Sequence, residues 1–316
     1  MSSGQSELST SSVIGIHHVG MSVSDLKASV EFYSEALGVD LHSTSETMQI
    51  EDVSLGFSTP SHSAVLAFPN GYLKLSEYDR SDLPPSAVLP VKGPGITHVC
   101  YQSPTSQDIY QRLMDGGATS VSRGEQPVHL LGQGVYYAYA RDHDGIMYET
   151  EHLDRTPFEG PIWFSHAALV SPDLDRLVEF YSLLFDAKPN RRTDRASGPR
   201  FDEVAGYDNV MIRAAWFDIG NMILEMWQFV NPVTPEPQRA AAIEDLGYNK
   251  VAFEVSDLQK EYERLTALGV AFLSSPAMSV DGWEVCLRDP DGNLISLIQP
   301  KTQDDLSVSH LKQKTW

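Results

Sequence analysis

The stretch GIHHVGMSV (15–23) introduces a pattern that returns three times along the chain. The later copies are GITHVCYQS (95–103), WFSHAALVS (163–171) and YNKVAFEVS (248–256). Each copy is a short apolar run, and it is followed by an amphipathic helical segment and then by further strand-like runs. Self-similarity at a regular spacing is typical of a repeated structural unit, so the sequence predicts four β-α-β-β-β units.

The helical segments indicate how the units are related. The first and third share the pentapeptide Val-Glu-Phe-Tyr-Ser, at 30–34 and 178–182. The second and fourth share Tyr-x-Arg-Leu, within SQDIYQRLMDGGA (106–118) and DLQKEYERLTALGV (257–270). Odd units therefore resemble odd units and even units resemble even units, which indicates a two-unit ancestor that was duplicated once.

Polar residues recur at one register of these apolar strands. Three first strands carry a histidine at the same point, His18, His98 and His166, and the fourth carries Lys250. At the matching point of the last strands stand Lys74, Glu149, Glu225 and Ser296. Histidine and glutamate on neighbouring strands are typical metal ligands, so the pattern predicts a metal site.

Three motifs together give the chain a family resemblance. They are the Ile-x-His-Val/Ala first strand, the Phe-Tyr helix and the Asp-x-Asp-Gly turn before the last strand, at 142–145 and 289–292. In these motifs the chain resembles the vicinal oxygen chelate superfamily, which includes glyoxalase I, methylmalonyl-CoA epimerase, extradiol dioxygenases and fosfomycin- and bleomycin-resistance proteins. The resemblance covers about residues 13–79, 95–152, 162–230 and 247–299. It implies an α+β fold in which four βαβββ units pair into two open mixed-sheet barrels.

The resemblance also implies that two paired units supply the ligands of one metal, so the pairing decides the site. If units one and two pair, His18, His98 and Glu149 form a two-histidine, one-carboxylate triad, which leaves open positions for substrate and dioxygen on Fe(II). If units two and three pair, the set is His98, Glu149, His166 and Glu225. That second set suits Zn²⁺, Ni²⁺ or Co²⁺ and proton-transfer chemistry.

The odd-even similarity favours the first pairing, because duplication of a two-unit barrel would produce it. We therefore expect one domain at 13–152, a linker at 153–161 and a second domain at 162–300. Flexible tails are expected at 1–12 and 301–316.

Three further residues are candidates for acid-base chemistry. Tyr137 and Tyr139 share one face of the run VYYAYA (135–140), which directly precedes the Asp-His-Asp-Gly turn. A tyrosine hydroxyl near a metal can orient or protonate a bound oxyanion. For these tyrosines, aromatic packing in a strand is the favoured interpretation. His129, in the preceding loop, is a second acid-base candidate.

Composition narrows the class of protein. The formal net charge is −20, from 43 acidic and 23 basic residues, which argues against a nucleic-acid partner and against anionic membranes. No apolar stretch approaches the roughly 20 residues of a membrane span, and no signal peptide is apparent. Two cysteines cannot build a disulfide framework, so we expect a cytoplasmic protein. We also expect a small-molecule substrate, and the sequence is compatible with a homo-oligomer.

These observations lead to a ranked expectation about function. The first is a mononuclear divalent-metal enzyme, an Fe(II)-dependent dioxygenase whose substrate chelates the metal through vicinal oxygens, with Mn, Zn, Ni or Co as other metals. The alternative is a glyoxalase- or epimerase-like lyase or isomerase. A metal-free protein that sequesters a ligand is the non-enzymatic alternative. The sequence contains no phosphate-binding loop or nucleophile elbow that would suggest another reaction class.

Overall fold

The computed structural model describes residues 10–52, 57–79, 88–124, 126–130, 132–302 and 305–313. Unit one contains β1 (Val13–Val23), α1 (Leu26–Leu37), β2 (Asp40–Asp52), β3 (Phe57–Phe68) and β4 (Gly71–Tyr78). Unit two contains β5 (Gly95–Pro104), η1 (Thr105–Gln107), α2 (Ile109–Asp115), β6 (Thr119–Ser120), β7 (Val128–His129), β8 (Val135–Arg141) and β9 (Met147–Leu153). The repeated β-α-β-β-β order predicted from the sequence is present in both.

The second half repeats this order. Unit three contains β10 (Trp163–Val170), α3 (Leu174–Phe185), β11 (Arg191–Ser197), α4 (Pro199–Ala205), β12 (Met211–Ile219) and β13 (Met222–Asn231). Unit four contains β14 (Gly247–Val255), α5 (Leu258–Ala267), β15 (Ala277–Met278), β16 (Trp283–Arg288) and β17 (Leu294–Gln299), and the short helix η2 (Val308–His310) follows it. The α+β prediction is confirmed. Among the described residues, no helix is both long enough and apolar enough to cross a bilayer.

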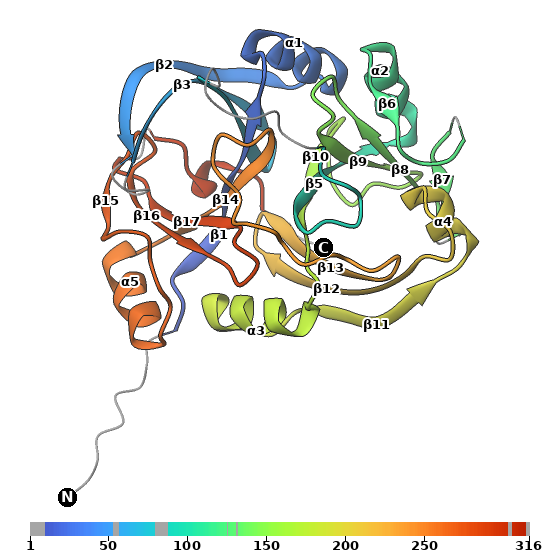
Figure 1. The fold of residues 1–316 in the computed structure, drawn as a ribbon. Coiled ribbons are helices and arrows are strands. Elements are labelled where there is room, and N and C mark those ends of the chain that lie inside the picture. The colour runs from blue at the N-terminus through green and yellow to red at the C-terminus, as the bar shows by residue number, and fades with distance from the viewer. Residues whose placement is uncertain are drawn as a thin grey trace, which may run out of the picture.

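Two mixed sheets organise these strands. One sheet has the order β15-β16-β17-β14-β1-β4-β3-β2 and combines units one and four. The other has the order β11-β12-β13-β10-β5-β9-β8-β6 and combines units two and three. In Figure 1 the blue and orange-red strands of the first sheet lie on the left, and the green and yellow strands of the second lie on the right.

The expected pairing of unit one with two and of unit three with four is therefore wrong. Within each sheet the two units are joined by antiparallel pairing of their first strands, β1 with β14 in one sheet and β5 with β10 in the other. Each sheet contains strands from both sides of the linker at 153–161. The segments 13–152 and 162–300 therefore do not each form a sheet of their own. The first strands of units one and two are not neighbours in either sheet, and neither are those of units three and four.

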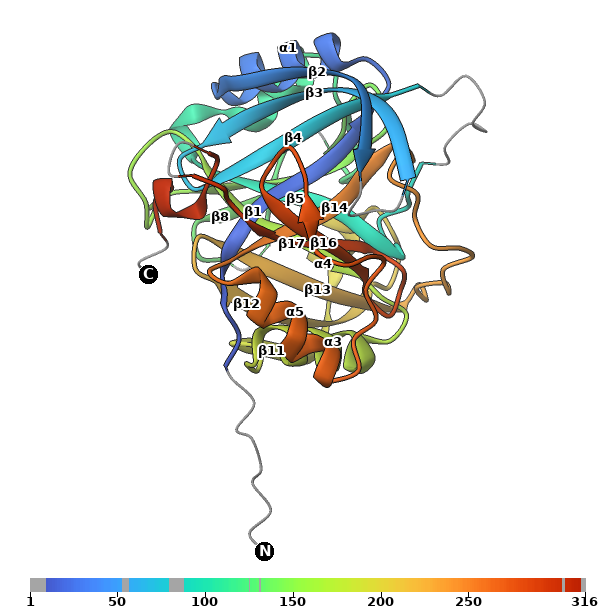
Figure 2. The same cartoon turned by 90° about the vertical axis from the view of Figure 1, so that its left-hand side faces the viewer.

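Units one and two meet through their helices and turns, and so do units three and four. Tyr33 of α1 donates a 2.8 Å hydrogen bond to Asp142, the first aspartate of the turn in unit two. Tyr181 of α3 makes the corresponding 3.3 Å bond to Asp289 of unit four. The helices of one pair lie together at the top of the view in Figure 1 and those of the other pair at the bottom, an arrangement that Figure 2 shows from the side.

The Arg residues of the even helices complete this contact. Arg112 of α2 donates to the backbone carbonyl of Glu35 at 2.5 Å, and Arg264 of α5 donates to that of Leu184 at 2.7 Å. Each arginine thereby binds a carbonyl near the C-terminal end of the preceding unit's helix, where a positive charge is favourable. The motifs shared by odd units and by even units are thus explained by helix docking.

Candidate metal centre

The second sheet brings the predicted ligands together through its register. Residues directly opposite one another on neighbouring strands point to the same face of a sheet. In register across the strands, Glu225, Ala168 and His98 form one row, and Glu149, Cys100 and His166 form the other. A small residue, Ala168 or Cys100, separates histidine from glutamate in each row, so the four longer side chains can converge above these two residues.

The four side chains form a compact buried cluster. One ligand atom of each of His98, Glu149, His166 and Glu225 lies within 4.8 Å of the others. His166 Nε2 is 3.0 Å from Glu149 Oε2 and 3.3 Å from Glu225 Oε2, and His98 Nε2 is 3.3 Å from Glu149 Oε2. All four residues are at most 5% exposed. Within the part of the chain that the structure describes, no second cluster of this kind is found.

Unpartnered polar atoms show that this cluster fits a cation. His98 Nε2 and Glu225 Oε2 are buried and have no hydrogen-bond partner. Leaving buried polar atoms without a partner costs about 1–3 kcal/mol each, unless a ligand satisfies them. Two imidazoles and two carboxylates are the donor types that Zn²⁺, Ni²⁺ and Co²⁺ accept in proteins. A divalent cation would fit this donor set.

The electrostatics of the cluster are those of closely coupled acids and bases. Burial opposes ionisation of Glu149, but the hydrogen bond from His166 and the close approach of His98 outweigh it and hold its pKa at about 2. Burial also lowers the pKa of His166, and the neighbouring carboxylates of Glu225 and Glu149 raise it to about 9. The side chains thus hold negative charge in a buried place, which favours a cation.

Residues around the cluster orient the ligands. Trp216 Nε1 donates a 2.5 Å hydrogen bond to Glu225 Oε1, and Thr97 Oγ1 lies 3.0 Å from His98 Nδ1. Such contacts fix the orientation of ligand side chains, and removing one typically costs 10- to 100-fold in metal affinity. Trp216 lies directly opposite Glu225 in the β12–β13 register, so the sheet itself sets this contact.

A cavity of about 390 Å³ opens beside the cluster. Its wall includes Glu149, His166 and Glu225, and most of the rest is apolar or aromatic, with Phe201 of α4 and Trp227 of β13 among the lining residues. A largely apolar cavity with a few polar groups is the usual form of a small-molecule site.

The structure separates the three acid-base candidates. Tyr137 and Tyr139 both line the cavity, and the Tyr139 ring lies 5.0 Å from the His98 ring between centroids. Burial raises the pKa of both hydroxyls, so they stay protonated and can donate hydrogen bonds. His129 is not among the lining residues. Its Nε2 accepts a 3.0 Å hydrogen bond from the backbone N–H of Gly134, which gives it a role in the loop.

His18, the third ligand of the expected triad, lies in the other sheet. It is opposite Ala252, which is opposite Ser296, so its row has serine where the metal cluster has glutamate. The second row of that sheet contains Lys250, Gly20 and Lys74. The equivalence of positions predicted from the sequence is thus visible in the register, but the triad of His18, His98 and Glu149 does not assemble.

Ion pairs occupy this equivalent place in the first sheet. Lys74 Nζ is 2.5 Å from Asp281, and Lys250 Nζ is 2.9 Å from Glu284. Burial alone would raise the pKa of Asp281, but the Lys74 ammonium outweighs it and holds that pKa well below its usual range. Two lysine ammonium groups therefore supply positive charge where the second sheet has ligands for a cation.

A family model for the Glyoxalase/Bleomycin resistance protein/Dioxygenase superfamily matches residues 15–150 and 163–297. The chain belongs to this superfamily. Each match covers one half of the chain, so each half carries one odd and one even unit of the superfamily pattern.

Individual members of the superfamily are similar at low identity. An ethylmalonyl-CoA/methylmalonyl-CoA epimerase from Cereibacter sphaeroides is 25% identical over 143 residues, which are 44% of this chain and 97% of the epimerase. A lactoylglutathione lyase from Arabidopsis thaliana is 26% identical over 180 residues, 56% of each chain. The chain thus spans about half the length of that plant relative.

Solved structures of the superfamily show the same fold. Glyoxalase I from Zea mays is 21% identical with a TM-score of 0.64, over 90% of this chain and 92% of the maize chain. A putative dioxygenase from Bacillus subtilis is 13% identical with a TM-score of 0.59, over 97% of this chain and 92% of its own. At these identities the similarity establishes the fold of the superfamily.

Several cavity residues of this superfamily member were not predicted. Trp216, Arg191 and Gln102 line the cavity, and the Gln102 amide donates a hydrogen bond to Glu151. Burial raises the pKa of Glu151 to about 7. A signal for Trp216 exists in the sequence, because Trp216 precedes Glu225 across a short hairpin and would face it. Arg191 has no such signal, since its place depends on how an edge strand pairs.

Proposed function

We propose that this protein is a divalent-metal-dependent lyase or isomerase that moves a proton on a substrate with two adjacent oxygen atoms. The observation that carries the proposal is the convergence of His98, Glu149, His166 and Glu225, the last three of which line a largely apolar cavity. The lyase or isomerase was the expectation tied to this ligand set, and Zn²⁺, Ni²⁺ or Co²⁺ are the metals that we propose.

The chain's own residues would divide the work. His98 and His166 would hold the cation through Nε2 and Glu149 through Oε2, and Glu225 would be the fourth ligand while it does not carry the proton. A bound divalent cation would stabilise negative charge that develops on two adjacent substrate oxygens. The carboxylates are also the groups in position to take a proton from the substrate carbon and return it.

Glu225 is the better candidate for the proton transfer. Trp216 holds its Oε1, whereas its Oε2 has no hydrogen-bond partner in the described structure. Glu149, by contrast, lies within hydrogen-bonding distance of His166 and close to His98. The protonated hydroxyls of Tyr137 and Tyr139 would donate to substrate oxygens, and the apolar cavity wall would exclude water.

The Fe(II) dioxygenase is the less supported function. That expectation depended on a triad with His18, which leaves positions open for substrate and dioxygen together. A set of two histidines and two glutamates leaves fewer open positions and favours proton transfer. The similarity to the Bacillus putative dioxygenase lies in the fold and does not favour that reaction.

The test is proton exchange measured without oxygen. Protein loaded separately with Zn²⁺, Ni²⁺, Co²⁺ or Fe²⁺ is incubated in D₂O with lactoylglutathione or methylmalonyl-CoA, the compounds named in the two relatives. We expect NMR to show deuterium entering the carbon next to the carbonyl, with a rate about 10²-fold or more above the metal-free protein. Glu225→Gln should abolish the exchange, and His18→Ala should leave it unchanged.

Dioxygen consumption distinguishes the alternatives. Turnover that requires Fe²⁺ and consumes dioxygen, with no exchange under argon, would replace this proposal with a dioxygenase. Absence of a bound metal after loading would contradict both.

A further inference from the structure

Arg191 is a charged residue of the cavity wall that the proposed proton transfer does not use. The residues with acidic, guanidinium or imidazole side chains that line the cavity are His166, Arg191, Glu149, Glu151 and Glu225. Arg191 is exposed and stands on β11, the edge strand of the sheet. It is therefore a cation at the rim of a cavity whose other charged or ionisable groups of this kind are three carboxylates and one histidine.

The register connects Arg191 to the metal ligands. Arg191 is directly opposite Trp216 on β12, and Trp216 is directly opposite Glu225 on β13. The guanidinium carbon lies 3.9 Å from the centre of the Trp216 ring. Two strand spacings place the Arg191 backbone about 10 Å from that of Glu225. A molecule that reaches from the cluster to the rim would thus meet this guanidinium.

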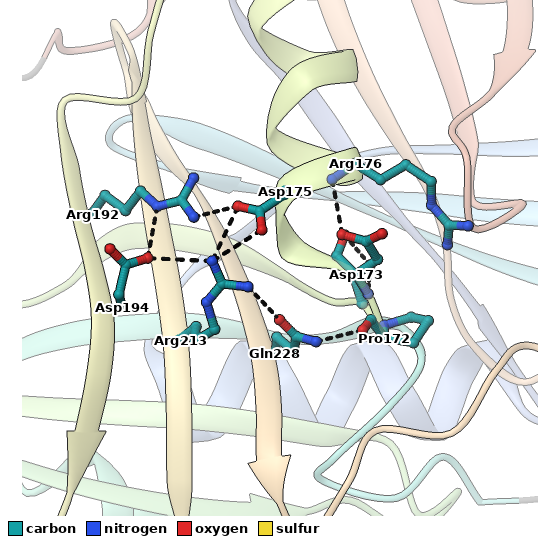
Figure 3. Close-up of polar contacts among 9 residues, drawn as sticks. Pro172, Asp173, Asp175, Arg176, Arg192, Asp194, Arg213 and Gln228 are labelled. Atoms are coloured by element: carbon teal, nitrogen blue, oxygen red, sulfur yellow. Dashed lines mark hydrogen bonds and ion pairs between the residues drawn. The ribbon is translucent and has the colours of Figure 1, made fainter.

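Arg192 and Arg213 form ion pairs with carboxylates, whereas Arg191 forms none with the described residues. Arg192 bonds to Asp194 at 3.1 Å and also to Asp175 of α3, and Arg213 bonds to Asp175 at 3.1 Å. Figure 3 shows this network of side chains beside α3. Alternation along the strand places Arg192 on the opposite face from Arg191. Among the described residues, no carboxylate forms an ion pair with Arg191.

We propose that Arg191 binds a carboxylate at the end of the substrate that points away from the metal ligands. The cation–π contact with Trp216 holds the guanidinium at the rim but gives it no partner of opposite charge, and its planar fork matches a carboxylate. This inference rests on the proposed function and narrows its substrate: two adjacent oxygens at one end, an apolar middle and a carboxylate at the other end.

The experiment uses chelators that need no turnover. Alkyl hydroxamates supply two adjacent oxygens to a metal, and their far end can carry a carboxylate or a methyl group. A series with two to six methylene groups is titrated against Co²⁺-loaded full-length protein, and the visible cobalt spectrum reports binding. We expect one spacer length for which the carboxylate improves affinity about tenfold over the uncharged analogue, as for one charge-assisted hydrogen bond.

Two strand variants assign this preference. Arg191→Met keeps an unbranched side chain against Trp216 and should remove the preference, while affinity for the uncharged analogue changes less than about twofold. Arg195→Met is the matched control, because Arg195 is an exposed residue of the same strand that does not line the cavity. It removes one positive charge and should keep the preference.

The outcomes are separable. No preference at any spacer length, or a preference that persists in Arg191→Met and in Arg191→Gln, would overturn the role of Arg191. A preference lost equally in Arg195→Met would show a general charge effect and would also overturn it. If Co²⁺ does not bind, or uncharged hydroxamates leave its spectrum unchanged, the metal site fails and this inference fails with it.

Discussion

Lys250 and Lys74 stand at positions where the sheet with the metal cluster has a histidine and a glutamate. Lys250 pairs with Glu284, and both side chains are buried, with exposures of 9% and 2%. A buried ion pair is a weak contributor while intact, because desolvation offsets the attraction, but removal of one partner leaves an uncompensated charge. The pair therefore matters most when it is broken.

We expect Lys250→Ala to lower the free energy of unfolding by about 3–5 kcal/mol, because Glu284 would remain buried without its cation. Urea denaturation would measure this. The double variant Lys250→Met, Glu284→Gln serves as the control and should recover most of the loss. A loss below about 1 kcal/mol in Lys250→Ala would show that water reaches Glu284.

The same pair predicts a response to acid. Burial raises the pKa of Glu284, but Lys250 outweighs it and the folded-state pKa lies below the ordinary value. A depressed carboxyl pKa stabilises the fold above the unfolded pKa of about 4.3, and this stabilisation is lost as the pH falls through the folded pKa. The free energy of unfolding, measured by urea denaturation, should therefore decrease as the pH is lowered below about 4.3. The decrease should be smaller in the double variant.

The proposed metal binding also depends on single residues. His166→Ala and Glu225→Ala should reduce the metal content of the purified, reloaded protein from about one per chain to near zero, because each removes a ligand from the cluster. His18→Ala is the matched control in the other sheet and should keep full metal content. Elemental analysis is the measurement, and loss of metal in His18→Ala would point to a second site.

At the level of elements, the Phe-Tyr helices are joined to the turns of the next unit. Tyr33 is fully buried, and its hydroxyl donates a hydrogen bond to Asp142 Oδ2. Asp142 Oδ1 accepts hydrogen bonds from the backbone N–H groups of Asp144 and Ile146. One carboxylate thus fixes the turn before β9 and attaches it to α1. This arrangement explains why the two motifs occur together in the sequence.

We expect Tyr33→Phe to lower the free energy of unfolding by about 1–2 kcal/mol, since a buried hydrogen bond to a carboxylate is lost. Tyr181→Phe should cost less, because its bond to Asp289 is longer, 3.3 Å against 2.8 Å. Tyr262→Phe is the control, because its hydroxyl makes no hydrogen bond with the described residues. Equal losses in all three variants would contradict the proposed role of the turn contacts.

These contacts also explain what the sequence could and could not predict. The four units, their helices and the register of the candidate ligands follow from local periodicity, which each unit carries in its own residues. The pairing of units does not, because both pairings give the same local pattern. The odd-even similarity favours pairing within each half of the chain, yet Arg112 and Arg264, which are part of that similarity, join helices. The Fe(II) triad with His18 failed for this reason.

At the scale of the whole molecule, two asparagines connect the sheets. Asn70, in the β3–β4 turn, donates to the backbone carbonyls of Phe164 and Asn221 at 2.7 and 2.8 Å. Asn221, in the β12–β13 turn, donates to those of Ile16 and Asn70 at 3.0 and 2.8 Å. Both residues are fully buried. Each asparagine therefore joins units one and three across the boundary between the sheets.

A cut in the linker should leave the molecule intact. A protease site placed between Glu159 and Gly160, both exposed, would separate the halves in sequence only. Because β5 pairs with β10 and β1 pairs with β14 across the halves, the cleaved protein should elute at the uncut size and keep its metal. Size-exclusion chromatography with elemental analysis measures both. Separation of the fragments under native conditions would contradict the sheet topology.

The exchange of strands between the halves has a consequence for descent. A polypeptide of half this length could complete neither sheet alone, so it would have to form a symmetric homodimer with two identical metal sites. Fusion of two gene copies frees the halves to diverge. In this chain one sheet has two histidines and two glutamates, while the other has Lys74, Lys250 and Ser296 at three of the equivalent positions. Two halves of one polypeptide can differ in sequence, so their two sites can differ, whereas a symmetric homodimer must have two identical sites.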